Sequence, residues 1–393
     1  MKKVIKYIFH PDHLLITILT FVLLVSCFWL VNCFTALDPW KKITGNLSMT
    51  DFFFKVGYDY SDVNQDITVV DIKDEFKRGN IARTIAKVDS LHPWITGVDI
   101  VFKGLKGKPE SNQLLMETAE RVGNNVVWVS RLEDYDQDKK AFAGKVSSFF
   151  ADSLGVKEGF ANLDDNYEHN RIRKMLTIEG LGNGMMSSFP LAIAQALDTM
   201  EIEPHKKLII DYTTKINVVP ADSIDAYEDF IKDHIVLIGS TTDENDKWDT
   251  PLGKLPGVLI QAYSVLTARG SRDIRYASLW TNLLIAFVLC YIFTLLVNAC
   301  AHWSTSSNTA FGQFLVDSLL LNRILSLVFL GLVAFGILWL FLYYHVYVDA
   351  ILILLLLGFV IVVRPIYIAT VKALSRRHNW KFLNNSLFNT NKK

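Results

Sequence analysis

Four long apolar runs constrain this chain more than any other feature, because each can cross a lipid bilayer as a helix. The first run, residues 13–34, contains no Asp, Glu, Lys or Arg, and the others cover residues 279–300, about 324–344 and about 347–368. A helix needs ~20 apolar residues to span ~30 Å of hydrocarbon, so we predict four transmembrane helices. The turn around residues 343–345 is short, which predicts that the last two helices form an antiparallel hairpin.

Basic residues at both ends of the chain predict its orientation. Lysines at positions 2, 3 and 6 fall in residues 1–12, and residues 369–393 carry six further Lys or Arg residues. Basic segments stay on the cytoplasmic side, and four crossings return the chain to that side. Residues 35–278 are therefore predicted to be extracytoplasmic, at a bacterial inner membrane. Residues 301–323 are predicted to be a cytoplasmic linker with a short surface helix, and Arg364 to reach the lipid headgroups.

The cysteines exclude disulfides from the middle of the chain. All four lie inside apolar runs, at Cys27, Cys33, Cys290 and Cys300. The domain between the first two membrane helices must therefore be held together by its own core. Residues 24–27 (LVSC) also resemble a lipoprotein cleavage box, which would make Cys27 a lipidated N-terminus. The apolar run continues through residues 28–34, which favours an uncleaved membrane anchor.

Strand-like and helix-like patterns alternate in residues 35–278. Runs rich in β-branched residues lie at 67–72, 98–102, 126–129, 208–212, 216–219 and 235–238. Between them apolar residues recur at helical spacing, as at Ile81, Ile85 and Val88, and a last helix is predicted at residues 258–268. Strands without strict polar alternation, separated by helices, are typical of a mostly parallel sheet covered on both faces. We therefore predict a three-layer α/β fold, with residues 133–175 as an excursion from the sheet.

Polar residues gather where the predicted strands end. In parallel sheets, ligands bind beyond the carboxyl ends of the strands, so these residues are candidates for a binding site. The candidate ligand-binding residues are Asp71, Asp99, Arg131, Thr241, Thr242, Asp246, Asp249 and Thr250. Each aspartate also has a structural alternative, because aspartates at strand ends often cap helices or accept hydrogen bonds from loop amides.

Three further motifs could have either a chemical role or a purely structural role. Asp243, Asn245, Asp246 and Asp249 could ligate calcium, but the run lacks the glycine and terminal glutamate of the standard loop. Residues 180–184 (GLGNG) resemble a phosphate-binding turn but follow no clear strand. Asp164, Asp165, Glu168 and His169 could do acid–base chemistry, although an exposed turn of this composition is the simpler reading. We predict no metal, no cofactor and no catalytic residue.

Several of these segments resemble a known family, the second type of CHASE domain (cyclase/histidine-kinase-associated sensory extracellular). The likeness is carried by ITVVDIKDE at 67–75, GVDIVF at 97–102, EGFANLDDNYEHNRIRKM at 158–175 and HIVLIGSTTDENDKWDTPLGKLPGVLIQA at 234–262. The order of one anchor, an outer domain and three closing helices also resembles the family. The resemblance implies an extracytoplasmic domain that senses a ligand.

The chain departs from the family pattern at three points. Gln261 stands where a histidine is expected, and Asn112 stands where an aspartate commonly follows the second strand. Members of the family usually continue into a kinase or cyclase, whereas only about 25 residues (369–393) follow the last predicted helix, too few for a catalytic domain. The resemblance therefore implies a receptor that signals through a separate partner.

Three functions are compatible with these sequence features. We predict a ligand-sensing receptor subunit that is not an enzyme; it would bind a small molecule or an envelope component and work with a separate signalling or envelope protein. The alternatives are an envelope assembly factor whose outer domain docks another protein, and an extracytoplasmic hydrolase with an Asp-rich site. The formal net charge of zero gives no reason to expect a nucleic acid partner, and we predict none. The four predicted membrane helices are expected to contact membrane lipid.

Overall fold

The structure is a computed structural model that describes residues 2–33, 49–73, 75–163, 171–198, 205–270, 274–306, 319–378 and 380–389. The chain divides into two compact units. One unit contains residues 1–49 together with 275–393, and the other contains residues 50–274.

The first unit consists mainly of long apolar helices. Four helices in the described residues are long and apolar enough to cross a membrane, the same number as the predicted spans. These are α2 (Pro11–Cys33), α10 (Leu279–Ser306), α12 (Leu319–Tyr344) and α13 (Ala350–Arg377), preceded by α1 (Lys2–Ile8) and followed by α14 (Lys381–Asn385). A pair of two-residue strands, β14 (Arg275–Tyr276) and β15 (Val346–Tyr347), lies near the turn between α12 and α13. The linker helix that we predicted falls largely on residues 307–318, outside the described residues.

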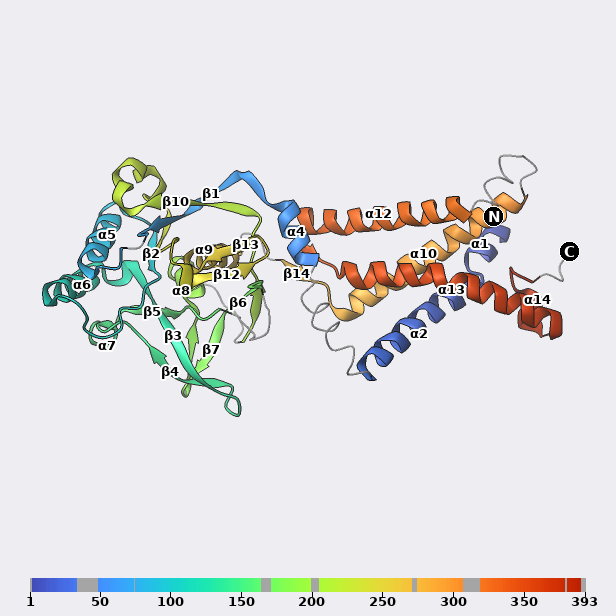
Figure 1. Ribbon diagram of the computed structural model, residues 1–393, viewed down its shortest axis with the longest axis horizontal. Helices are drawn as coiled ribbons and strands as arrows, with labels where there is room; N and C mark the ends of the chain where they lie inside the picture. Colours follow the sequence, from blue (N-terminus) through green and yellow to red (C-terminus); the bar gives the residue numbers. More distant parts are fainter. Residues whose placement is uncertain are drawn as a thin grey trace. The chain divides into compact units, whose positions relative to one another are not determined.

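The second unit is built on a mixed sheet of nine strands (Figure 1). Its path runs β10-β1-β11-β2-β3-β4-β7-β8, with β5 paired to β3, and all pairs are parallel except β3–β4 and β7–β8. The strands are β1 (Asp59–Asp71), β2 (Ile95–Val98), β3 (Val126–Asp136), β4 (Ala141–Val146), β5 (Lys157–Phe160), β7 (Ile178–Leu181), β8 (Gly184–Ser187), β10 (Thr214–Pro220) and β11 (Ile235–Gly239). Two small sheets pair β6 (Lys174–Leu176) with β9 (Lys207–Ile209), and β12 (Lys247–Thr250) with β13 (Gly253–Pro256).

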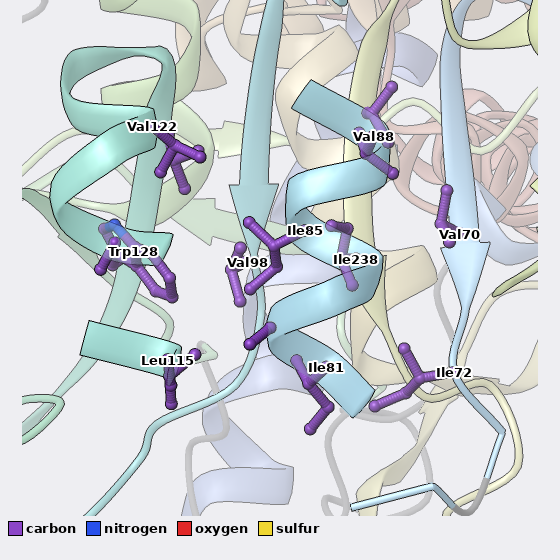
Figure 2. Close-up of a cluster of buried hydrophobic side chains, with 14 of the residues drawn as sticks. Val70, Ile72, Ile81, Ile85, Val88, Val98, Leu115, Val122, Trp128 and Ile238 are labelled. Atoms are coloured by element: carbon purple, nitrogen blue, oxygen red, sulfur yellow. The ribbon is translucent and has the colours of Figure 1, made fainter. Parts of the chain in front are cut away.

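Helices cover one face of the sheet with an apolar core. Helices α5 (Arg78–Ser90) and α6 (Pro109–Val122) pack side by side on the strands. Ile81, Ile85 and Val88 of α5 belong to one buried cluster with the strand residues Val98 and Ile238, and Ile85 lies beside Val98 (Figure 2). Their four-residue and three-residue spacing puts them on one side of the helix, which explains why this segment forms a helix here.

The opposite face is covered by α8 (Phe189–Leu197) and α9 (Gly257–Ala268). Because side chains alternate along a strand, Gly97 points away from the face that Val98 occupies. A Cβ atom at residue 97 would lie 2.6 Å from Ile193 and 2.8 Å from Phe189, both in α8. The sheet therefore has helices on both faces, and the predicted three-layer α/β class is confirmed.

Several predicted boundaries were wrong. The second strand was predicted at residues 98–102 but runs from Ile95 to Val98. The excursion at 133–175 begins inside a strand, since β3 continues to Asp136 and returns as β4. The glycine-rich residues 180–184 are the turn of the β7–β8 hairpin, with Gly182 at φ +59°. The strand at 208–212 lies in a separate small sheet.

Candidate functional site

A large cavity opens at the carboxyl ends of the central strands. It has a volume of about 1190 Å³ and lies wholly within residues 99–261, inside the second unit. Its wall comes from the segment after β2, the outer half of β3, the loop after β5, β12 and the first turns of α9. A cavity of this size accommodates a small molecule, since ligand pockets measure ~300–1000 Å³.

Two carboxylates line the cavity close to the start of α9. Asp99 follows β2 directly, and Asp246 precedes β12. Burial, together with the negative charge of Asp246, raises the pKa of Asp99 from 3.8 to about 7. The pKa of Asp246 is also raised, mainly by burial, although Trp248 Nε1 donates to its Oδ1 at 3.0 Å. Near neutral pH, Asp99 can therefore change its charge when something binds beside it.

The backbone at the start of α9 leaves space for this pair. Residue 257 is a glycine, and a Cβ atom there would collide with the Asp246 carboxylate. Gly257 N–H also lowers the pKa of Asp246 by a hydrogen bond, against the effect of burial. The first turn of α9 thus presents its positive end to the Asp246 carboxylate.

Arg131 brings positive charge to the same cavity from β3. Its side chain is exposed and lines the wall. The backbone next to it is fixed by Asn162, whose side chain accepts from Leu132 N at 2.8 Å and donates to Leu132 O at 3.0 Å. Asp99, Arg131 and Asp246 are thus three of the predicted residues that the structure brings together around one cavity.

Asp71 and Thr241 form a separate structural contact. The Asp71 carboxylate accepts from Thr241 N at 2.9 Å, from Thr241 Oγ1 at 2.7 Å and from Lys73 N at 2.9 Å. It therefore joins the loop after β1 to the loop after β11. Thr242, beside this contact, is exposed and accepts or donates a hydrogen bond to Ser240 Oγ at 3.4 Å. None of these three predicted residues is among those lining the cavity.

Asp249 and Thr250 lie in the β12–β13 hairpin. The Thr250 hydroxyl is buried and donates to Gly253 O at 2.7 Å, which closes the turn. Asp249 is exposed, and its backbone oxygen accepts from Ile172 N at 2.7 Å. Neither residue lines the cavity, so this pair holds the hairpin that carries Asp246 and Trp248.

Other residues line the cavity that the sequence did not single out. Glu179 and His205 form a contact of 3.1 Å between Oε2 and Nδ1. Gln261 of α9 donates to Ala161 O at 3.2 Å. Asn112, by contrast, accepts a hydrogen bond from Arg78 and does not line the cavity. Glu179 and His205 come from outside the parallel core, where no strand-end pattern could have indicated them. Gln261 stood out only as a departure from the CHASE pattern.

Metal ligation finds no support in this region. Within the described ranges, no group of three or more His, Cys, Asp or Glu side chains could hold a metal ion. Asp243 accepts from Asn245 N at 2.9 Å and so caps a short turn. The acidic run at residues 164–169 falls outside the described residues.

A comparison with models of known protein families gave one match. The sequence profile of the CHASE2 domain matches residues 19–297, well over half of the chain. No curated protein and no solved structure gave a match. The matched range contains all the strands and helices of the second unit, including every residue that lines the cavity. The chain belongs to the CHASE2 domain family, a family of sensory domains.

Proposed function

We propose that this protein is a membrane-anchored receptor subunit whose outer domain binds a small polar ligand in the cavity beside Asp99. The observation that carries the proposal is the cavity itself, at the carboxyl edge of the sheet, with Asp99, Asp246 and Arg131 in its wall. Membership of a sensory domain family and four helices that could span a membrane also support the proposal.

The lining of the cavity favours a ligand that is polar rather than apolar. Carboxylates of Asp99 and Asp246 lie in the wall together with Arg131 and Lys140, so opposite charges are available to one molecule. A ligand that makes hydrogen bonds to such groups is discriminated from analogues that cannot, because unpaired buried polar groups are costly. We expect the ligand to come from the extracytoplasmic space or the envelope.

The signal is proposed to reach a separate partner protein, with no catalytic step in this chain. Helix α9 contributes Gly257 and Gln261 to the cavity and is the last long element of the second unit. A ligand that contacts α9 can therefore change its position, and that change is what a receptor passes on. The partner would be a signalling or envelope protein of the same membrane.

Ligand binding can be tested on the full-length protein in lipid nanodiscs. Thermal unfolding is measured against a panel of amino acids, sugars, polyamines and small carboxylates, since a bound ligand raises the unfolding temperature. Compounds that stabilise the protein are then tested on the variants Asp99→Asn and Arg131→Gln. We expect both variants to lose at least tenfold in affinity.

Asp249→Asn serves as the matched control, because Asp249 lies three residues from Asp246 but outside the cavity. It should bind like the wild type. Equal affinity in Asp99→Asn, Arg131→Gln and the wild type would place the ligand elsewhere. A full panel without any stabilising compound, together with stoichiometric capture of another envelope protein by the outer domain, would favour the assembly role instead.

A further inference from the structure

The first unit contains a buried aspartate that no ligand site explains. Asp12 lies in the first turn of α2 and is 0% exposed. A carboxylate inside a bundle of apolar helices is costly, and it is retained where it has a role. An apolar residue of similar volume would stabilise the bundle as well or better.

The two carboxylate oxygens of Asp12 contact two different elements. Oδ1 accepts from Tyr367 Oη of α13 at 2.7 Å. Oδ2 accepts from Ser386 Oγ at 2.9 Å and from Leu387 N at 2.6 Å, both in the segment that follows α14. One carboxylate therefore holds α13 on one side and the C-terminal segment on the other.

Further contacts keep the C-terminal segment in the same place. His10 Nε2 lies 3.1 Å from Asn385 O, and the rings of Tyr367 and Phe388 meet edge to face at 6.2 Å. Leu383 and Ser386 are each only 2% exposed. Residues 380–389, which we call the tail segment, are thus packed on the start of α2 and the end of α13.

A second chain of polar contacts joins α2 to α10 and α13 through His13, the residue after Asp12. Arg364 Nε of α13 donates to Asn298 Oδ1 of α10 at 2.7 Å, and Asn298 Nδ2 lies 3.0 Å from His13 Nδ1. Arg364, which we predicted at the headgroups, thus turns toward α10. A shift of α13 against α2 must therefore change both the Arg364–Asn298–His13 chain and the bond from Tyr367 to Asp12.

We propose that Asp12 is a latch that keeps the tail segment on the helices, and that a shift of α13 against α2 releases it. Helix shifts of ~1–2 Å are a common signalling movement, and they are enough to break a hydrogen bond. This proposal rests on the proposed receptor function, because release of the tail segment would be the response to ligand binding. It assigns to Tyr367 the role of coupling α13 to the tail.

The latch can be tested by hydrogen–deuterium exchange of the full-length protein in nanodiscs, without any ligand. Asp12→Asn keeps the shape of the side chain but cannot accept from both sides, and Tyr367→Phe removes only the contact with α13. Hydrogen bonds to charged groups are among the stronger ones, so we expect the amides of residues 382–389 to exchange about tenfold faster or more in both variants. Ser386→Ala, which alters the tail side alone, should do the same.

Tyr291→Phe is the matched control, because the hydroxyl that it removes donates to Ile8 O at 2.6 Å and not to the tail segment. It should exchange like the wild type in residues 382–389. Unchanged tail exchange in Asp12→Asn, Tyr367→Phe and Ser386→Ala would overturn the proposal. So would faster exchange of α2 and α13 together with the tail, since Asp12 would then only support the bundle. Either failure leaves the cavity untouched, because ligand binding is measured on the other unit.

Discussion

Asp99 and Asp51 show how two aspartates of one domain respond to pH in opposite ways. Burial, together with the negative charge of Asp246, raises the pKa of Asp99 to about 7. Asp51 is also buried, which by itself would raise its pKa, but hydrogen bonds from Arg173 and Arg171 hold the pKa below its usual value. The same residue type therefore weakens the fold in one place at neutral pH and stabilises it in the other.

Asp99→Asn is expected to stabilise the protein at pH 8. A raised pKa means that the folded state favours the protonated form, so the wild type loses stability as pH rises from about 4 to about 7. Asparagine stays neutral and should remove this pH dependence. The measurement is the thermal unfolding midpoint in nanodiscs between pH 4 and pH 8. Parallel curves for the variant and the wild type would show that Asp99 is not the titrating group.

Asp51→Ala is expected to destabilise the second unit by about 3 kcal/mol, since it leaves the guanidinium groups of Arg171 and Arg173 without their carboxylate. Arg173 donates to both Asp51 oxygens, at 2.7 and 2.8 Å. The lowered pKa means that this contribution is present at neutral pH and is lost as pH falls through the folded-state pKa of Asp51. Denaturant unfolding at pH 7 measures the loss, with the exposed Asp152→Asn as control, which should change stability by less than ~0.5 kcal/mol.

At the scale of the elements, β2 depends on the absence of a side chain at Gly97. A Cβ atom there would lie 2.5 Å from Leu237 and 2.6 Å from Ile193. Gly97→Val is therefore expected to cost about 3 kcal/mol by overpacking between β2, β11 and α8. Gly144→Val is the comparison, because a Cβ atom at residue 144 meets nothing within 4 Å. Similar unfolding midpoints for the two variants would show that α8 can move aside.

Periodicity predicted the elements of the parallel core well, because their patterns reflect burial on two faces. The helix with Ile81, Ile85 and Val88 and the strand at residues 235–238 were placed within a few residues. The antiparallel hairpin β3–β4 was missed because its outer residues are exposed and give no buried run. Gly97 in β2 hid the true start of that strand, since glycine is depleted in strands.

The site was predicted only in part, for a related reason. Strand-end position indicated Asp99, Arg131 and Asp246, which line the cavity, but it equally indicated Asp71 and Thr250, which bond to backbone or loop groups nearby. Sequence position shows that a polar residue lies at the edge of the sheet. It does not show whether a neighbouring loop satisfies that residue.

At the scale of the whole molecule, the charge bias predicts that both ends of the chain share one side of the membrane. In a variant without the native cysteines, Asp152→Cys and Lys381→Cys each place a thiol at an exposed position. A membrane-impermeant maleimide should label the first from the extracytoplasmic side of intact cells, and the second only after the membrane is opened. Equal labelling of both in intact cells would contradict the four-span topology.

The position of β11 in the sheet has a consequence for folding during synthesis. β11 lies between β1 and β2, which come well over a hundred residues earlier in the chain. Until residue 239 has emerged, β1 and β2 each have an unpaired edge toward the place that β11 will fill, and such edges promote association between chains. Contacts of such long sequence separation also slow folding. The domain can therefore complete its core only when nearly all of it has been synthesised, shortly before α10 is made.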